Sequence, residues 1–166
     1  LDFGVAFDGD ADRAVFIDDV GKVVSGSMMT TLIADYLSEK NDNLKVVYNV
    51  NVSPHALSIL ESKGVSLFRC KVGHSNIKAL MKELEADFGG EHSAHFYYKD
   101  NYFADSAILT LLMLMSIVSE RGEKVSSMID KYNFPPSSGE INFTVEDVNI
   151  SLDKIKKLFS GNFDEL

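Results

Sequence analysis

Three aspartates stand at alternate positions near the start of the sequence, in residues 7–13, which read F-D-G-D-A-D-R. In an extended chain alternate side chains point the same way, so Asp8, Asp10 and Asp12 can converge their oxygens on one hard divalent cation. Magnesium is favoured over calcium, because three carboxylates leave octahedral positions open for a phosphoryl oxygen. Arg13, next to this cluster, would then be a fork donor for a phosphate.

The acidic segment has two competing interpretations. An EF-hand loop would need glycine where Arg13 stands, glutamate where Asp19 stands and a helix upstream, so that interpretation fails. A solvated acidic turn without a cation stays open, although three carboxylates between apolar strands are costly unless they are neutralised. The flanking residues 3–7 and 14–17 are apolar, which predicts that the acidic loop joins two buried strands.

Polar residues gather again in two later segments. Residues 89–95, G-G-E-H-S-A-H, place Glu, Ser and His at alternate positions, which suits a ligand with several hydroxyls; an ordinary polar loop is the alternative. Residues 71–74, K-V-G-H, follow an expected strand and precede an expected helix, where α/β sheets place ligand contacts. His74 taken alone is more typical of a helix cap or a surface position.

The composition describes a globular chain. Its 166 residues are 45% apolar, with a formal net charge of -9 and a pI near 4.8. This balance argues against nucleic acid or an anionic membrane as a partner, while a small phosphorylated substrate remains possible. The one cysteine, Cys70, excludes an internal disulfide and favours a reducing, cytoplasmic location. Residues 107–118 are apolar but too short to span a bilayer, which predicts a core helix.

Strand and helix patterns alternate between residues 44 and 120, which predicts a three-layer α/β/α domain with a mixed, mainly parallel sheet. Ser27 is expected to cap the first helix, and Ser53 with Pro54 to begin the next one, which Gly64 ends. Strands are expected at residues 44–50 and 65–69. Helices are expected at residues 54–62, from about 105 to 120 and at 124–132, with another whose apolar face is Ile77, Leu80, Met81 and Leu84.

The C-terminal part is set off by a linker. Residues 134–139, F-P-P-S-S-G, stop regular structure. Beyond them we expect a strand at residues 140–145 and a helical face of Leu152, Ile155, Leu158 and Phe159 that ends at Gly161. The sequence begins without methionine and almost inside a strand, which suggests that it was cut from a longer chain.

Three motifs occur together in the order and spacing of a known family. They are F-D-G-D-A-D-R, then K-V-G-H-S-x-I-K, then G-G-E-H-S-A-H followed by Y-Y-K-D-N-Y-F-A-D-S. Over essentially the whole chain they resemble the α-D-phosphohexomutases, the phosphomannomutase and phosphoglucomutase superfamily. The resemblance implies that residues 1–22 end the family's second domain, that 23–134 are its third domain, and that 135–166 are the linker and start of its fourth.

The resemblance also implies roles for the acidic segment. Asp8, Asp10 and Asp12 match the family's magnesium ligands. Arg13 matches the arginine beside its phosphoserine and substrate, which makes it a candidate catalytic residue.

Further roles follow for the later motifs. Glu91 and Ser93 match the loop that holds O3 and O4 of the hexose. His95 and His74 match histidines that line the same cleft, so both are candidate catalytic residues and His95 also a candidate substrate contact. Lys71 lies near a position where the family often has a basic residue that meets the substrate.

The sequence departs from the family pattern in places. Ala94 stands where many members have glycine, and Asn51 lies where some members carry a lysine. The catalytic serine loop of the family's first domain and the phosphate-binding loop of its fourth are missing from this sequence. Residues 1–166 alone are therefore not expected to turn over substrate.

The family's activity is the interconversion of hexose 6-phosphate and hexose 1-phosphate, with mannose or glucose as the sugar, through a phosphoserine. Here that serine would lie outside the chain. Two alternatives stay open. One is an acidic-loop metal-dependent phosphatase with Asp8 as nucleophile, although Asp12 departs from its D-x-D-x-T/V pattern. The other is a non-catalytic sugar-phosphate-binding domain.

Overall fold

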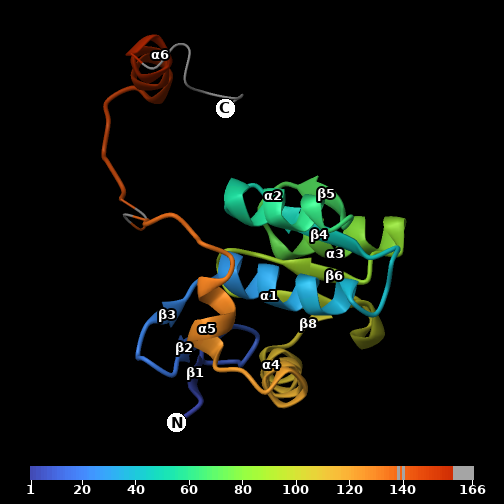
Figure 1. Cartoon of the computed structure of the whole chain (residues 1–166). Helices are drawn as coiled ribbons and strands as arrows, with labels where there is room; N and C mark the ends of the chain where they lie inside the picture. Colours follow the sequence, from blue (N-terminus) through green and yellow to red (C-terminus); the bar gives the residue numbers. More distant parts are fainter. Residues whose placement is uncertain (138, 140, 159–166) are drawn as a thin grey trace. The chain divides into compact units, whose positions relative to one another are not determined.

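The computed structural model describes residues 1–137, 139 and 141–158 and divides the chain into two units, Leu1–Pro135 and Pro136–Leu166 (Figure 1). Among the described residues no helix is both long and apolar enough to cross a membrane.

The main sheet of the first unit is mixed, as predicted. Its order is β5 (Ser66–Cys70), β4 (Lys45–Asn49), β6 (Phe88–Gly90), β7 (Phe96–Tyr98) and β8 (Ala104–Asp105). Strand β4 pairs in parallel with β5 and β6, whereas β7 pairs antiparallel with β6 and β8. Two of the four strand pairs are therefore parallel, and their carboxyl ends lie at one edge of the sheet.

Helices cover both faces of this sheet because alternate strand residues bury their side chains on opposite sides. Val46 and Phe96 join one apolar cluster, together with residues of α1 (Gly26–Ser38) and α4 (Ala107–Arg121). Val47 and Tyr97 join a second cluster. The first cluster also includes residues of α2 (Pro54–Ser62) and α5 (Val125–Asp130), while the second is built on α3 (His74–Leu84).

A second, antiparallel sheet carries the acidic loop. It consists of β1 (Phe3–Phe7), β2 (Ala14–Asp18) and β3 (Val23–Val24), and it lies beside α4 and α5 (Figure 1). The two predicted strands are confirmed, but their complete burial was wrong. Along β2, Phe16 is buried while Val15 and Ile17 are about 40% exposed, because this sheet packs helices on one face only.

Three helix starts differ from the prediction or refine it. The cap of α1 is Ser25, whose Oγ accepts from the Met28 amide, and Ser27 lies buried in the first turn instead. Ser53 is the N-cap residue of α2, as predicted, but its side chain makes no capping hydrogen bond there. Helix α4 begins at Ala107, two residues later than expected, because Ser106 caps it through the Leu109 amide.

In the second unit the predicted strand is wrong for residues 141–145, and Glu140 lies outside the described residues. Ile141 and Phe143 are exposed there, and in the described part of this unit no strand pairs with them. An isolated strand leaves its backbone groups unpaired and is not stable alone. Helix α6 (Val148–Leu158) forms as expected, while the predicted Phe159 contact and the Gly161 end lie outside the described residues.

A buried acid joins the helices on one face of the sheet. Asp35 of α1 forms ion pairs with Lys63 and with Arg121, and it accepts a hydrogen bond of 2.5 Å from the Tyr132 hydroxyl. Burial alone would raise the pKa of Asp35, but the hydrogen bonds from Lys63 and Tyr132 outweigh burial and hold the pKa below its ordinary value.

We expect Asp35 to make folding stability depend on acid pH. Because its pKa is lower in the folded state than the value of about 3.9 in an unfolded chain, its contribution is present above pH 4 and is lost as the pH falls through the folded pKa. Thermal unfolding of wild type and Asp35→Asn between pH 7 and pH 3 measures this. The stability difference between the two should shrink toward pH 3; a difference that stays constant across this range contradicts the expectation.

Candidate functional site

The acidic loop between β1 and β2 is a compact turn. The Ala11 amide donates to the Asp8 carbonyl oxygen at 3.3 Å, and Ala11 adopts a positive φ of 59°. The turn gathers the carboxylates of Asp8, Asp10 and Asp12, whose ligand atoms lie within 4.8 Å of one another. The structure therefore brings together the three aspartates that the sequence singled out.

Arg13 neutralises one side of this cluster. Its amide and its Nε donate to the two carboxylate oxygens of Asp8 at 3.2 and 2.6 Å. The Arg13 hydrogen bond is the main reason that the pKa of Asp8 falls to about 2. Asp8 is therefore a carboxylate across the whole physiological range.

Asp12 has the opposite environment. Burial is the main cause that raises its pKa, against the opposing effect of His95. Its Oδ1 is a buried oxygen that has no hydrogen-bond partner among the described residues. Its contact with Arg13 Nε is an ion pair at 3.8 Å, too long for a hydrogen bond. A buried carboxylate oxygen without a hydrogen bond, beside two further carboxylates, is a donor set that suits a hard divalent cation, so these residues fit Mg²⁺.

The polar segment 91–95 forms a tight loop between β6 and β7. The Ala94 amide donates to the Glu91 carbonyl at 3.2 Å, and the Glu91 amide donates to the His95 carbonyl at 3.0 Å. Ala94 is left-handed, with a φ of 69°. Glycine would fit this position well, because it has no Cβ and adopts a left-handed conformation without strain.

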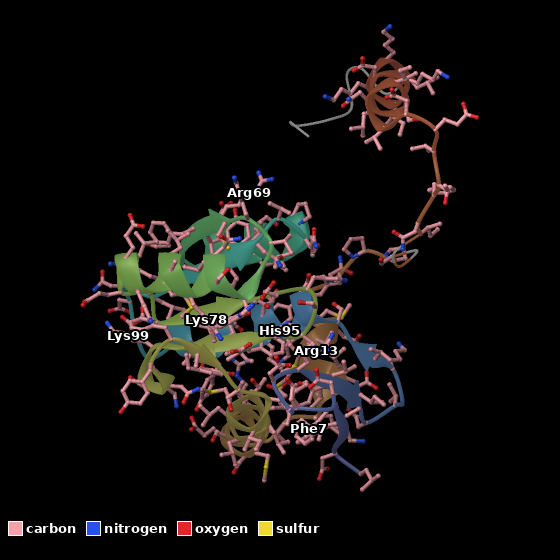
Figure 2. The ribbon with its side chains drawn as sticks, turned by 180° about the vertical axis from the view of Figure 1, so that it is seen from behind. Phe7, Arg13, Arg69, Lys78, His95 and Lys99 are labelled. Atoms are coloured by element: carbon pink, nitrogen blue, oxygen red, sulfur yellow. The ribbon has the colours of Figure 1, made fainter. Side chains whose placement is uncertain are left out.

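The two loops meet at the backbone. The Ala14 amide donates to the Ala94 carbonyl at 3.2 Å, and Arg13 forms an antiparallel bridge with His95. Figure 2 shows the side chains of Arg13 and His95 beside each other at this junction. The His95 Nε2 atom lies 3.6 Å from Asp12 Oδ2, so an imidazole from the second loop faces a carboxylate from the first.

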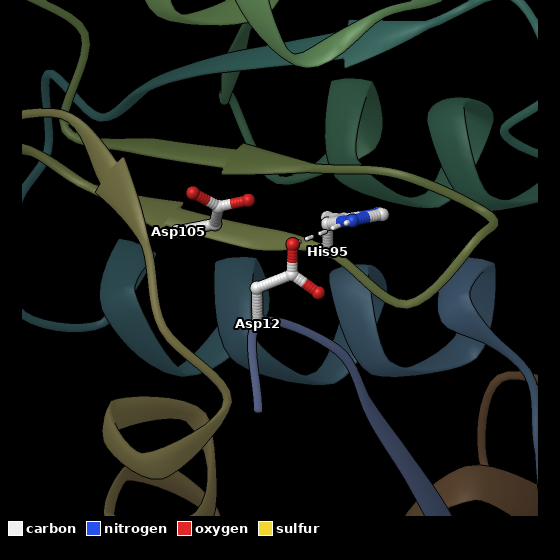
Figure 3. Close-up of side chains that lie close together, drawn as sticks. All are labelled: Asp12, His95 and Asp105. Atoms are coloured by element: carbon white, nitrogen blue, oxygen red, sulfur yellow. Dashed lines mark ion pairs between the residues drawn. The ribbon is translucent and has the colours of Figure 1, made fainter. Parts of the chain in front are cut away.

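Asp105 of β8 completes this junction. Its carboxylate lies with Asp12 and His95 in a group whose ligand atoms are within 4.8 Å of one another (Figure 3). Lys78 of α3 pairs with Asp105 at 2.7 Å. Sequence reasoning had placed Asp105 only at the start of a helix; its position in the motif F-A-D-S was the one signal that could have assigned it to the site.

Glu91 is buried and held from two sides. It is only 4% exposed, its Oε1 accepts from the Tyr97 hydroxyl and its Oε2 accepts from Asn49 Nδ2, both at 2.5 Å. Ser93 lies on the exposed side of the loop, where its Oγ is 3.0 Å from His95 Nδ1. No local pattern in the sequence predicts the contacts of Glu91 with Asn49 and Tyr97.

Lys71 and His74 lie at the same edge of the sheet. Strands β4 and β5 end together, because Asn49 pairs with Cys70, and Glu91 follows the end of β6. Lys71 follows Cys70 directly, and His74 is the first residue of α3. Both side chains are exposed, and within the described part of the chain no hydrogen bond or ion pair joins them to the acidic loop or to Glu91.

The first turn of α1 supports the loop from behind. Ser27 Oγ lies 2.9 Å from His92 Nδ1 and accepts from the Ser53 amide at 3.0 Å. A Cβ added at Gly26 would lie 2.4 Å from the carbonyl oxygens of both Glu91 and His92. Gly26 therefore permits a backbone approach that no other residue allows.

A pocket of about 720 Å³ lies at the opposite edge of the sheet. Its lining includes Leu44 and Asp87, which precede β4 and β6, and none of the candidate residues. In an open α/β sheet, ligands bind beyond the carboxyl ends of the strands. We therefore place the site at the junction of the two loops and not in this pocket.

Comparisons with known proteins agree with this geometry. The family model described as phosphoglucomutase/phosphomannomutase, alpha/beta/alpha domain III, matches residues 25–133. A phosphomannomutase of Methanocaldococcus jannaschii is 36% identical over 158 residues, which cover 95% of this chain and 35% of that protein. The chain therefore belongs to the phosphoglucomutase/phosphomannomutase family, and it spans about a third of the length of such curated relatives.

Solved structures confirm the fold. A phosphoglucomutase/phosphomannomutase family protein from Burkholderia thailandensis has a TM-score of 0.74 at 28% identity, covering 81% of this chain and 29% of that one. An N-acetylphosphoglucosamine mutase from Aspergillus fumigatus has a TM-score of 0.63 at 14% identity, covering 76% of this chain and 34% of that one. The second likeness is one of fold alone. The predicted superfamily and the predicted α/β/α class are confirmed.

We expect Gly26→Ala to disturb the loop and lower stability. The new methyl group would overlap the carbonyl oxygens of Glu91 and His92, and overpacking of this kind costs about 1–3 kcal/mol. Urea unfolding measures the loss, and amide chemical shifts of Glu91 and His92 report the displaced loop. The matched control is Gly4→Ala, where the added Cβ meets Ile17 Cβ at an ordinary 3.8 Å. Equal effects of the two substitutions would contradict the close approach.

Proposed function

We propose that this chain is the metal- and sugar-binding part of a magnesium-dependent phosphohexomutase, phosphomannomutase-like in type. The whole protein would interconvert hexose 6-phosphate and hexose 1-phosphate, with mannose or glucose as the sugar, through a phosphoserine outside residues 1–166. The observation that carries the proposal is the junction of the two loops, where Asp12 lies 3.6 Å from His95. The acidic loop, whose carboxylates suit a phosphoryl-transfer centre, thereby lies next to the 91–95 loop, whose side chains suit a ligand with several hydroxyls.

Asp8, Asp10 and Asp12 would hold the magnesium ion. When bound, the ion would stabilise the negative charge of the phosphoryl group as it moves. The Aspergillus fumigatus mutase is described in complex with GlcNAc-6P and magnesium, and its fold is shared. The buried Asp12 Oδ1 atom, which accepts no hydrogen bond from the described residues, supports the same use of the acidic loop in this chain.

Arg13 would bind the phosphate of the substrate, and the histidines would transfer a proton. Arg13 is half-exposed, so its guanidinium can bind a phosphate as a fork donor. His95 can exchange a proton with a hexose hydroxyl or phosphate through Nε2, because Ser93 occupies its Nδ1. His74, at the start of α3, is the second candidate catalytic histidine.

Substrate binding is proposed for Lys71, Glu91, Ser93 and His95. Glu91 offers acceptor oxygens and Ser93 a hydroxyl that can donate or accept, so the two suit neighbouring hydroxyls of a hexose. Lys71 would contribute a cation for the phosphate from the same sheet edge. The net charge of -9 supports the absence of nucleic acid and of an anionic membrane among the partners. A cytoplasmic location is proposed on the grounds that Cys70 is unpaired.

The proposed domain limits are 1–22 for the end of domain 2, 23–134 for domain 3, and 135–166 for the linker and start of domain 4. Domains 1 and 4 of the parent chain would supply the phosphoserine and the phosphate loop. One face of the β1–β2 ladder supports this division, because Val15 and Ile17 of β2 both lie on it and are 40% and 38% exposed. The rest of domain 2 would cover this apolar face.

The phosphatase alternative is less well supported by the geometry. Both carboxylate oxygens of Asp8 accept hydrogen bonds from Arg13, and this pairing lowers its nucleophilicity. Asp8 is therefore better suited to bind the metal than to attack a phosphate.

Magnesium should bind to the acidic loop, and Asp10→Ala should abolish that binding because it removes one of three ligands. Titration of the 166-residue chain with MgCl2, followed by amide chemical shifts of residues 8–13, measures it. The control is Asp42→Asn, which removes a charge from an exposed loop. Equal magnesium responses of the wild type and Asp10→Ala would remove the metal from the proposal.

Mannose 6-phosphate should bind at the loop junction, and Glu91→Gln should weaken it about tenfold, as expected for one charged hydrogen-bonding partner worth about 1.4 kcal/mol. Isothermal titration calorimetry in the presence of MgCl2 measures the affinity. Glu61→Gln on the exposed side of α2 is the matched control. If neither mannose nor glucose phosphates bind the wild type, the sugar-binding role is wrong.

A further inference from the structure

The Glu91 carboxylate is the most completely held side chain at the loop junction. Its two oxygens accept from donors on two different strands, Asn49 at the end of β4 and Tyr97 in the middle of β7. Asn49 lies 42 residues from Glu91 in the sequence, so the register of the sheet creates this contact.

Asn49 is oriented so that it can only donate to Glu91. Its Oδ1 accepts from the Asn51 amide at 3.2 Å, which leaves Nδ2 to face the carboxylate. An aspartate at this position would present a second negative charge to Glu91. The asparagine therefore has a chemical reason: it supplies a fixed N–H donor without adding charge.

Tyr97 is oriented by packing. Its side chain is fully buried in the cluster with Ile77 and Met81 of α3. Gly89 lies opposite Tyr97 in the β6–β7 ladder, and a Cβ there would come within 3.2 Å of the Tyr97 Cβ and 2.7 Å of the Met81 sulfur. The missing side chain at Gly89 leaves room for the ring. Burial, and then the contact with Glu91, raise the pKa of Tyr97, so its hydroxyl stays protonated and donates.

These two donors determine which acceptor positions of the Glu91 carboxylate remain free for a ligand. A carboxylate has about four lone-pair positions, and the internal donors take one on each oxygen. One lone-pair position therefore remains on each oxygen, and each can accept a hydrogen bond but cannot donate one. Such a group suits two neighbouring hydroxyls of one ligand, each of which donates.

We propose that Asn49 and Tyr97 are positioning residues that hold the Glu91 carboxylate as a two-point acceptor for neighbouring hydroxyls of the hexose phosphate. This inference rests on the proposed function, because it takes the hexose phosphate as the ligand. By orienting Glu91, Asn49 and Tyr97 would also contribute to specificity. A sugar that lacks one of the two hydroxyls would lose one of its two hydrogen bonds to Glu91.

The chain offers a matched control for Tyr97. Tyr98 is the next residue, is 7% exposed and donates its hydroxyl to Thr110 Oγ1 at 2.9 Å on the opposite face of the sheet. Tyr97→Phe and Tyr98→Phe each remove one buried hydroxyl and one hydrogen bond. A merely structural role for Tyr97 predicts equal consequences for the two substitutions.

The experiment compares wild type, Tyr97→Phe, Tyr98→Phe and Asn49→Leu as 166-residue chains. Calorimetric titration with mannose 6-phosphate and MgCl2 gives the affinity, and the ¹³C chemical shift of the Glu91 carboxylate at pH 7, assigned with Glu91→Gln, reports its hydrogen bonds. We expect both Phe substitutions to lower the melting temperature. Of these two Phe substitutions, only Tyr97→Phe should move the Glu91 resonance and weaken binding about tenfold. Asn49→Leu should also move the resonance and weaken binding. If Asn49→Leu does not fold, Tyr97→Phe decides the result.

Binding to Tyr97→Phe within twofold of wild type, or an equal loss in Tyr98→Phe, overturns the inference while leaving the proposed function intact. Failure of the wild type to bind any hexose phosphate overturns the proposed function instead. In that case the Glu91 resonance still tests the positioning: a shift in Tyr97→Phe alone supports it, and an unmoved resonance overturns it.

Discussion

The contact between the acidic loop and the β6–β7 loop is the constraint on which the rest of the site depends. Three carboxylates within 4.8 Å of one another repel, and Arg13 offsets this charge mainly at Asp8, with a longer contact of 3.8 Å to Asp12. The loop is nevertheless held in place from outside, by the Ala14 amide on the Ala94 carbonyl and by the bridge between Arg13 and His95. Backbone hydrogen bonds fix the position of the acidic loop without neutralising the carboxylates that a cation needs.

The support of the second loop comes from the core. The first turn of α1 approaches the backbone of Glu91 and His92 so closely that only glycine fits at position 26. Ser27 adds a polar contact to His92 and accepts from the Ser53 amide, which connects the loop to the start of α2. A loop held by two helices and two strands keeps its side chains oriented before any ligand arrives, which lowers the entropy that binding must overcome.

Charge and burial separate the roles of the acidic groups. Asp8 is paired with Arg13 and has a low pKa. Asp12 has a raised pKa and a buried oxygen that accepts no hydrogen bond from the described residues, and Glu91 is buried between two neutral donors. The Arg13 contact stabilises the negative charge of Asp8. Asp12 keeps an oxygen that can bind a cation, and the donors around Glu91 fix the orientation of its carboxylate. Asp105, which pairs with Lys78, adds a further carboxylate at the junction with Asp12 and His95.

The sequence by itself determined the local features. The alternation of Asp8, Asp10 and Asp12 follows from strand periodicity, the order of strands and helices follows from apolar spacing, and three motifs together indicated the family. Local reasoning was wrong where a neighbour decides the outcome: Ser25 and not Ser27 caps α1, and residues 141–145 form no strand, since in the described part of their unit no strand pairs with them.

Only the tertiary structure decided which side chains meet. Asn49 and Tyr97 reach Glu91 through the register of β4, β6 and β7, and Asp105 reaches His95 through β8. The longest of these contacts joins residues 42 positions apart, and sequence spacing carries no information about strand register over such a distance. The residue types that can do the chemistry are visible in the sequence, whereas their orientation is a property of the packed sheet.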